Sequence, residues 1–485
     1  MNAAGRLDKR ERDSISSVRA LANQAFSRAA GAPLVEGNSI RLLKDARENY
    51  PAWLAAIGNA KRHIHFETYF IYEDEVGWMF AEALVARARE GVRVRLIYDW
   101  LGGVAKTSRA FWKHLRAGGV EVRCYNPPRL DSPLSWISRD HRKLLAVDNQ
   151  VGFVTGLCIG RMWVGVPEKN IEPWRDTGVE VRGPSVGDIE GAFAQAWAMI
   201  GDPIPNHDRI NRDAIAPEGD VSLRVVASVP ATAGLFRLDQ LVAALASHRL
   251  WLTDAYYAGT TAYVQGLRAA AKDGVDVRLL VPNATDIPIL KPLSRAGYRP
   301  LLEAGVRVFE WNGTMLHAKT AVADSKWARV GSTNLNIASW LGNCELDVVV
   351  EDNAFAHLME EMYLRDLENA TEVVLDARHQ IRVPNQPHHS SPVLTSGGGS
   401  VGRAAAGAIR IGNAVGAAFT NRRVLEPIEA RIMVTVGVLF LSLGILFAFL
   451  PRLLAYPLIL VLVWIAVSLL YRGYILHRRK RMREK

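Results

Sequence analysis

Cysteine is scarce in this chain of 485 residues. Its three cysteines, Cys124, Cys158 and Cys344, are odd in number, and none stands in a C-x-x-C spacing. Disulfide frameworks and structural zinc sites both need cysteines in pairs or tight clusters, so the sequence predicts neither. A reducing, cytosolic setting fits this cysteine usage best.

The first 30 residues lack a continuous apolar stretch. A secretory signal peptide needs an apolar segment of roughly 7–15 residues, so we expect no such signal. Residues 1–37 are polar and rich in Arg and Ala, and they predict an N-terminal arm with a helix over 14–30. Two interpretations of the arm stay open, a solvated extension and a basic helix that touches lipid headgroups.

Positive charge is in small excess over most of the chain, although the formal net charge is +10. Residues 472–485 carry +6, and residues 421–431 and Arg452 each add +1, which leaves about +2 for residues 1–420. Proteins that track nucleic acid need a strongly basic surface to neutralise phosphates. The main body of the chain therefore indicates no nucleic-acid partner.

Two long apolar runs stand near the C-terminus, at residues 432–450 and 453–471. Each run has 19 residues without a charge, and only Pro451 and Arg452 separate them. This length is enough to cross about 30 Å of hydrocarbon, and the proline favours a tight break between two helices. Residues 426–485 therefore predict a transmembrane helical hairpin with a basic tail.

The charges that flank this hairpin predict its orientation. Arginines precede the first run and the basic tail follows the second, so the positive-inside rule places both ends in the cytoplasm. The expected location is a bacterial inner membrane, with multi-pass attachment and a cytoplasmic catalytic domain. Residues 379–425 predict a linker, in which 401–419 forms either an interfacial helix or a plain spacer.

Between the arm and the linker, short β-branched segments alternate with amphipathic ones, which is the pattern of an α/β fold. Three pairs of segments match within the chain: 62–70 with 249–257, 88–96 with 271–279, and 117–122 with 303–308. A duplication of this extent predicts two equivalent repeats, at residues 38–210 and 211–378. The first repeat also contains an insertion at 126–139, which is either a substrate-entry loop or an ordinary surface loop.

Each repeat contains one copy of the pattern H-x-K-x-x-x-x-D. We predict that the six residues of the two copies form the catalytic motif: His141, Lys143, Asp148, His317, Lys319 and Asp324. A single match in a chain of this length has a chance probability on the order of a few hundredths, and two in equivalent places far less. In a strand, the histidine and lysine project from one face, where the imidazole attacks or protonates and the ammonium holds an anion such as phosphate.

Further polar residues recur near each motif. Asp176 and Glu345 begin equivalent strand-like segments, and a carboxylate bonded to one ring nitrogen orients a catalytic histidine. The alternative is a purely structural bond between histidine and acid. Ser332, Asn334 and Asn336 are expected to add hydrogen-bond donors to the phosphate oxygens.

One histidine cannot easily both bond to phosphorus and protonate the departing alcohol, so the duplication predicts a division of labour across one phosphate. One histidine acts as the nucleophile, and the other acts as acid and then as base. Asp148 and Asp324 follow at a spacing that returns the chain through a turn, so within the motif we interpret them as supports rather than phosphate contacts. No ligand set for a metal is left over, and no cofactor is implied.

The sequence resembles the phospholipase D superfamily, whose signature is the duplicated H-x-K-x-x-x-x-D motif followed by G-S-x-N. Within that superfamily it is similar to the bacterial cardiolipin synthases. The resemblance covers about residues 38–378 and rests on both motifs, on 174–184 and on 331–336 through Glu345. One departure is Thr-Gly-Leu-Cys at 155–158, where family members commonly have Gly-Gly-x-Asn.

This resemblance implies two phospholipase D-type α/β repeats packed with pseudo-two-fold symmetry around one active site. It implies a phosphatidyltransferase that moves a phosphatidyl group from one phospholipid, typically phosphatidylglycerol, to the hydroxyl of another through a phosphohistidine. His141 is implied as the nucleophile and His317 as the acid and base. The implied partners are phospholipids and the membrane, and the sequence indicates no obligate protein partner.

Three alternatives stay open at this point. A membrane-bound phospholipase D hydrolase would transfer the phosphatidyl group to water. A nuclease of the same superfamily would cleave nucleic acid, although the small charge of the main body argues against it. A non-catalytic protein would bind anionic lipid and would not depend on either histidine.

Overall fold

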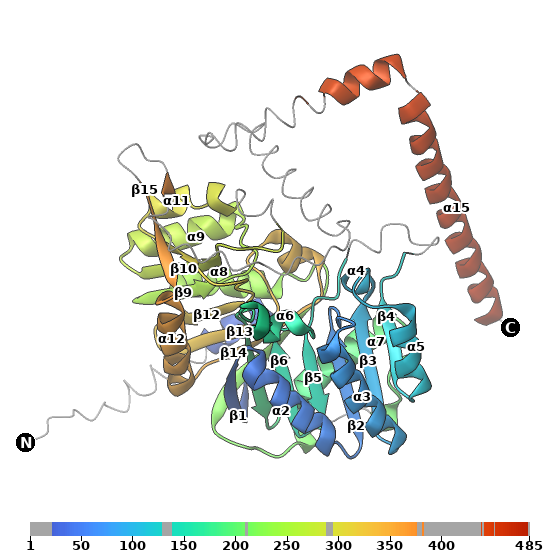
Figure 1. Ribbon diagram of the computed structural model, residues 1–485, viewed down its shortest axis with the longest axis horizontal. Coiled ribbons are helices and arrows are strands. Elements are labelled where there is room, and N and C mark those ends of the chain that lie inside the picture. The colour runs from blue at the N-terminus through green and yellow to red at the C-terminus, as the bar shows by residue number, and fades with distance from the viewer. Residues whose placement is uncertain are drawn as a thin grey trace, which may run out of the picture.

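The computed structural model of the protein describes residues 22–128, 138–208, 212–287, 294–375, 381–382, 438, 441–450 and 452–483. Two halves of the chain form the α/β body in Figure 1. Each half contributes seven strands in the same spatial order, and β1 of the first half pairs with β8 of the second to join them in one sheet. The two repeats predicted from the sequence are therefore structural equivalents.

The first half runs from β1 to α7. Its elements are β1 (Val35–Lys44), α2 (Asp45–Asn59), β2 (His63–Thr68), α3 (Glu75–Arg89), β3 (Arg93–Asp99), α4 (Trp100–Gly103), α5 (Arg109–Ala117), β4 (Glu121–Tyr125), β5 (Leu144–Val147), β6 (Val151–Thr155), α6 (Arg161–Val164), β7 (Thr177–Arg182) and α7 (Val186–Met199). The strand order is β1-β7-β6-β5-β2-β3-β4. β2, β3 and β4 are parallel, and α3 and α5 lie in the crossovers that parallel strands require.

The second half repeats this arrangement from β8 to α12. Its elements are β8 (Val221–Ser228), α8 (Gly234–Leu245), β9 (Arg249–Thr253), α9 (Thr261–Lys272), β10 (Asp276–Pro282), α11 (Arg299–Leu302), β11 (Arg307–Trp311), β12 (Thr320–Ala323), β13 (Trp327–Gly331), β14 (Glu345–Val350) and α12 (Asn353–Leu367). The strand order is β8-β14-β13-β12-β9-β10-β11. β15 (Ala370–Leu375) and β16 (Ile381–Arg382) extend the sheet beyond β11.

Side chains at the helix starts explain where several helices begin. Asp74 caps α3 by accepting a hydrogen bond from the amide of Gly77 at 3.0 Å. Thr260 caps α9 in the same way, and Asp352 caps α12 with a 2.7 Å bond from the amide of Phe355. Each cap satisfies a backbone N–H that the first turn of a helix leaves without a partner.

Helices cover both faces of the sheet. α2, α3 and α5 pack on one face of the first half, and α8, α9 and α11 pack on the corresponding face of the second. α7 and α12 pack on the other face, where Phe193 and Phe355 share one buried cluster with Leu316 and Leu346. Because this cluster removes apolar surface of both halves from water, the hydrophobic effect holds the halves together.

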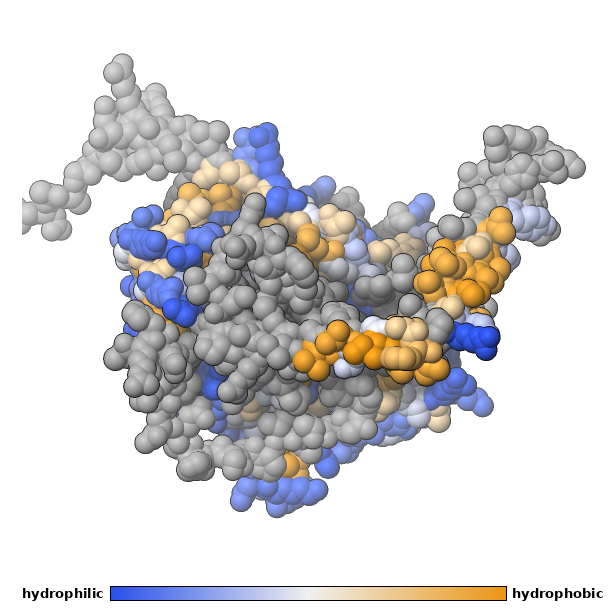
Figure 2. Space-filling view, turned by 90° about the horizontal axis from the view of Figure 1, so that it is seen from above, coloured by the Kyte–Doolittle hydropathy of each residue, from blue (hydrophilic) through white to orange (hydrophobic). Residues whose placement is uncertain are grey.

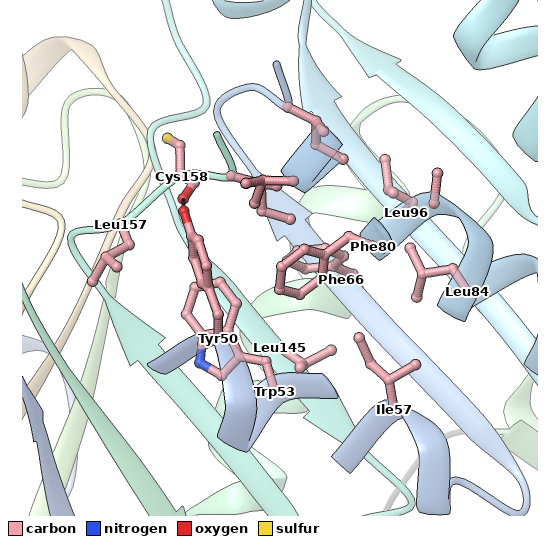
Figure 3. Close-up of a cluster of buried hydrophobic side chains, with 14 of the residues drawn as sticks. Tyr50, Trp53, Ile57, Phe66, Phe80, Leu84, Leu96, Leu145, Leu157 and Cys158 are labelled. Carbon is pink, nitrogen blue, oxygen red and sulfur yellow. Dashed lines mark hydrogen bonds between the residues drawn. The ribbon is translucent and has the colours of Figure 1, made fainter. Parts of the chain in front are cut away.

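Figure 3 shows the apolar cluster on the outer face of the first half. The rings of Tyr50 and Trp53 in α2 lie 5.2 and 6.1 Å from the ring of Phe80 in α3. The Tyr50 hydroxyl donates a 2.7 Å hydrogen bond to the carbonyl of Cys158, which is itself buried. α2 therefore fixes the segment that follows β6, at the end of the first motif.

The predicted hairpin falls in the C-terminal region, where the structure describes residues 441–450 and α15 (Arg452–Arg483). In the described part of the chain, no helix is both long and apolar enough to span a membrane. Many apolar side chains of α15 are exposed, for example Leu460 at 70% and Leu470 at 75%. Figure 2 shows orange patches on the side of the molecule where α15 lies.

Several sequence-based expectations concern residues outside the described part of the chain. They include most of the arm at 1–37, most of the insertion at 126–139, nearly all of the linker at 379–425 and residues 432–437 and 439–440 of the first apolar run. Within the arm, residues 22–30 are helical, inside the range predicted for a helix. β1 begins at Val35, before the predicted start of the first repeat at residue 38.

Candidate active site

The two motif histidines lie at the junctions between the halves. His141 precedes β5, and its Nδ1 lies 2.9 Å from Oε2 of Glu345, the first residue of β14. His317 precedes β12, and its Nδ1 lies 2.7 Å from Oδ2 of Asp176, just before β7. Each histidine is therefore paired with a carboxylate from the opposite repeat.

Backbone hydrogen bonds hold these crossed pairs in register. The amide of His141 donates to the carbonyl of Cys344 at 2.9 Å, and the amide of His317 donates to the carbonyl of Arg175 at 2.7 Å. Cys344 and Arg175 directly precede the two acids in the sequence. The main chain therefore sets which acid meets which histidine, and both halves are needed to do so.

One buried arginine reinforces each junction. Arg142 donates to the carbonyl of Ser228 at 2.9 Å and to that of Glu345 at 3.3 Å, so it ties the first motif to β8 and β14. Arg175 donates to both carboxylate oxygens of Asp366 in α12, with the shortest contact at 2.7 Å. Bidentate, charge-assisted bonds of this kind fix geometry as well as adding energy.

The two motif lysines are buried beside the histidines. Nζ of Lys319 lies 2.9 Å from Nδ1 of His317, and each lysine donates to the carbonyl of the histidine two residues before it. Burial and the charge of Lys143 together lower the pKa of Lys319 to about 8, against the opposing effect of Asp176. The positive charges of the two lysines therefore repel each other. A phosphate anion bound beside them would reduce that repulsion.

The surroundings of both histidines lower the pKa of the imidazole ring. Burial and the charge of Lys319 lower the pKa of His317 to about 3, against the opposing effect of Asp176. Burial also lowers the pKa of His141, and Glu345 opposes it. The carboxylates engage Nδ1 of both rings, so Nε2 is the nitrogen that each ring presents for chemistry.

Aromatic rings surround the two histidines unequally. Tyr69 lies 5.2 Å from His141, and its counterpart in the second half, Tyr256, lies 5.8 Å from His317, as measured between ring centroids. His317 also contacts Trp163 and Trp174, at 5.6 and 5.8 Å. Nε1 of Trp163 donates to Asp176 at 3.0 Å. The His317 side chain is accordingly the less exposed, at 7% against 12% for His141.

The motif aspartates lie at the far ends of the motif strands from the histidines. Asp148 follows β5 and accepts from the amides of Lys61, Arg62 and His63 at 2.6, 2.8 and 2.8 Å. Asp324 follows β12 and accepts from the corresponding amides at the start of β9. Both adopt positive φ, 55° and 50°, in the tight turns that lead to β6 and β13. Their contacts are those of supports for the turn and the neighbouring strand.

Residues 53–163 and 241–367 match the family described as "Cardiolipin synthase, PLD-like domain". A cardiolipin synthase of Alkalihalophilus pseudofirmus is 32% identical over 345 residues, covering 70% of this chain and 68% of the relative. The chain belongs to the cardiolipin synthase family. Another relative, the cardiolipin synthase of Geobacillus kaustophilus, is 33% identical over 344 residues, covering 70% of this chain and 68% of its own.

A solved structure shares the fold of this cardiolipin synthase family member. The phosphatidylserine synthase of Haemophilus influenzae superposes with a TM-score of 0.57 at 15% identity, covering 72% of this chain and 91% of that chain. Membership of the family, together with the paired motif, identifies an enzyme of the phospholipase D-type phosphatidyltransferase class.

The two halves of this family member differ at the residue that directly follows β6 in one and β13 in the other. In the second half, Ser332 donates a 2.6 Å hydrogen bond to Oε2 of Glu345, so it braces the acid that orients His141. Gly156 occupies the equivalent position in the first half. A Cβ there would collide with the carboxylate of Asp176. The shorter acid therefore fills the space that a serine side chain takes in the other half.

The two asparagines after Ser332 have different environments. Asn334 is buried, and its Oδ1 has no hydrogen-bond partner among the described residues. Asn336 donates from Nδ2 to the carbonyl of Tyr256 at 3.0 Å and accepts from the amide of Ser339 at 3.1 Å. Asn334 thus stays a candidate for substrate contact. Asn336 instead positions Tyr256 beside His317, which differs from its expected role as a phosphate donor.

A buried group of metal-ligating residues lies on β2 and α7. The ligand atoms of His63, His65 and Glu190 all lie within 4.8 Å of one another, although the sequence predicts no metal site. Glu190 is hydrogen-bonded to both rings, with a 2.9 Å contact to His63, and Nη1 of Arg95 lies 3.4 Å from the other nitrogen of His65. These residues satisfy one another, and an adjacent guanidinium disfavours a cation.

Sequence reasoning missed the aromatic and arginine residues of the site. A signal for Tyr69 and Tyr256 was present, because they align in the duplicated segments 62–70 and 249–257. No comparable signal exists for Trp163, since it has no counterpart in an aligned segment.

Proposed function

We propose that this protein moves a phosphatidyl group from one phosphatidylglycerol to the hydroxyl of another, forming cardiolipin and releasing glycerol. The observation that carries the proposal is the pair of crossed histidine–carboxylate contacts, each with a buried lysine beside it. The relatives named cardiolipin synthase support the choice of lipid. The proposed site residues are those of the two motifs with Asp176, Glu345, Ser332 and Asn334.

In the first step, Nε2 of His141 attacks the phosphorus of the donor. An N–P bond forms as the bond to the glycerol oxygen breaks, and protonated His317 delivers its proton to that oxygen. Asp176 stabilises the protonated ring because its carboxylate already holds Nδ1 at 2.7 Å. Lys143 and Lys319 balance the charge that develops on the phosphate oxygens.

In the second step, the acceptor hydroxyl attacks the phosphohistidine. Neutral His317 takes the proton of that hydroxyl, an O–P bond forms and the N–P bond breaks. A pKa lowered to about 3 by burial and Lys319 keeps His317 neutral in the empty site. A bound phosphate offsets the charge of Lys319 and so favours the protonated form that the first step needs.

The protein acts at a membrane in this proposal. The runs at 432–450 and 453–471 form the transmembrane hairpin, and the α/β body lies on the cytoplasmic side of a bacterial inner membrane. Exposed apolar side chains of α15 support a lipid contact, because surfaces of this kind are rare on soluble monomers.

Purified protein in vesicles that contain phosphatidylglycerol tests the proposal. Mass spectrometry should detect cardiolipin and glycerol in equal amounts with the wild-type protein. Neither product should form with His141→Ala or His317→Ala, while both variants stay in the membrane fraction.

Two other outcomes would replace the proposal. Phosphatidic acid as the only lipid product would identify a hydrolase. Full retention of function by both histidine variants would identify a non-catalytic lipid-binding protein.

A further inference from the structure

Arg139 is a buried cation at the end of the segment that leads into the first motif. Its side chain is 9% exposed, and its Nη1 donates to Oδ1 of Asp99 at 3.0 Å. Its Nε and Nη2 atoms have no hydrogen-bond partner among the described residues. These two atoms form the edge of a guanidinium that binds two oxygens of a carboxylate or phosphate side by side.

Asp99 holds this edge in one orientation. Its carboxylate also accepts from the amides of Leu101 at 2.8 Å, Gly102 at 3.1 Å and Asp140 at 2.9 Å. These bonds fix Asp99 at the start of α4, and Asp99 in turn fixes Nη1 of Arg139. The Nε/Nη2 edge is therefore preorganised, which lowers the cost of binding an anion there.

Arg139 stands two residues before His141, where the chain leads into the first motif. Arg139, His141 and Lys143 alternate along an extended segment, which the bridge between Asp140 and Cys344 keeps in register. Alternate residues of extended chain project from the same face, about 6.6 Å apart. Tyr69 lies beside the two motif residues, since its ring is 5.2 Å from that of His141 and 5.4 Å from Nζ of Lys143.

The second half has apolar residues at the equivalent place in its sequence. The residues two and one before His317 are Met315 and Leu316, which are fully buried in the apolar clusters. The site is therefore asymmetric about its pseudo-two-fold axis, with an additional anion-binding edge on the His141 side.

The chemistry of the transfer requires a second anion. The phosphate of the donor lies between the histidines and lysines, whereas phosphatidylglycerol as acceptor carries its own phosphodiester. Three carbons separate its attacking hydroxyl from that phosphodiester, a span comparable to two residues of extended chain. We propose, building on the proposed function, that the Nε/Nη2 edge of Arg139 binds the phosphodiester of the acceptor lipid and so selects an anionic acceptor.

Two reactions with the same donor test this assignment. Cardiolipin formation uses phosphatidylglycerol as acceptor, while exchange of labelled glycerol into phosphatidylglycerol uses a neutral one. Glycerol exchange must occur in any enzyme that releases glycerol, by microscopic reversibility. Arg139→Met should lower cardiolipin formation on the order of 10- to 100-fold and change glycerol exchange less than about threefold, because only the first reaction loses a charge-assisted bond.

Two further variants complete the test. Arg139→Lys keeps the charge without the planar fork and should recover part of the cardiolipin formation. Arg95→Met is the matched control, because Arg95 is equally buried in the same half but is paired with Asp208 at 3.0 Å. That variant should alter both reactions by the same factor.

An equal loss of both reactions in Arg139→Met would overturn the assignment, since it would place the edge on the donor phosphate or give Arg139 a purely structural role. Unchanged cardiolipin formation would overturn it as well. Failure of the proposed function is distinguishable, because the wild-type protein would then catalyse neither reaction.

Discussion

The two halves share a strand order but differ in how they finish the site. In the second half, Ser332 braces Glu345, and His317 lies among Trp163, Trp174 and Tyr256. In the first half, Gly156 leaves room for Asp176, and His141 has only Tyr69 as an aromatic neighbour among the ring contacts of the described residues. The two halves have kept the same backbone and the same crossed acids. The residues around each histidine have diverged, as expected if the two histidines have different roles.

The largest effects should come from the histidines themselves. His141→Ala and His317→Ala should each lower turnover by at least about 10³-fold, because both steps need a nucleophile and an acid or base. The two variants should differ in whether the covalent intermediate accumulates. A phosphatidyl-enzyme should be trapped by acid quench and mass spectrometry in His317→Ala and not in His141→Ala; trapping in His141→Ala alone would exchange the two roles.

Substitution of the two acids should give the next largest effects. It should also show that each acid serves the histidine of the other half. Asp176→Asn and Glu345→Gln should each lower activity by about 10²- to 10⁴-fold, since an amide loses the charge that orients the ring and stabilises its protonated form. A donor lipid with a p-nitrophenol leaving group needs little acid assistance. It should rescue Asp176→Asn, which impairs His317, more than Glu345→Gln; the reverse order would contradict the assignment of His317 as the acid.

Exchange of the bracing residues tests why the halves differ. Gly156→Ser should lower activity on the order of 10- to 100-fold and destabilise the fold by about 1–3 kcal/mol, because the new side chain displaces Asp176. Ser332→Gly should cost about 10-fold by releasing Glu345. Gly156→Ala is the control for Gly156→Ser in kinetic and thermal-unfolding measurements. If it behaved like the wild type, the collision of the Cβ with Asp176 would be excluded as the cause.

The smallest expected effect is a shift in pH dependence. Burial, with the charge of Lys143, lowers the pKa of Lys319 to about 8, so kcat/KM should fall as the pH rises through that value and the phosphate loses a positive partner. Lys319→Arg should move this alkaline limb to higher pH even if the peak rate drops. Lys143→Arg is the matched control and should leave the limb in place; a limb that does not move in Lys319→Arg would assign it to another group.

Much of this architecture follows from the duplicated sequence. The aligned segments predict two equivalent α/β repeats, and the identical strand orders agree with that prediction. The sequence predicts that Asp176 and Glu345 orient the histidines, and both acids contact them. The crossing itself was not predictable, because both acids occupy equivalent positions and a pattern along one chain does not say which histidine each acid meets.

Other features of the site depend on three-dimensional packing. Trp163 approaches His317 only because the halves dock, and no periodicity in the sequence marks it. Arg139 lies at the end of the insertion at 126–139, where its charge resembles that of any loop residue until its burial is known. The sequence predicts that Asn336 donates to the phosphate, but the backbone after β13 turns its amide toward the carbonyl of Tyr256.

The crossed acids have a consequence for the origin of the chain. A single half holds one histidine and the carboxylate that serves the other half's histidine, so an isolated half is chemically incomplete. Two identical halves related by a two-fold axis would complete each other symmetrically, as in an isologous homodimer. Fusion of such a dimer into one polypeptide would preserve both crossed histidine–carboxylate contacts. It would also allow equivalent positions to diverge, as at Gly156 and Ser332 or at Arg139 and Met315. The interface between two subunits would thereby become the buried contact between the two halves of one enzyme.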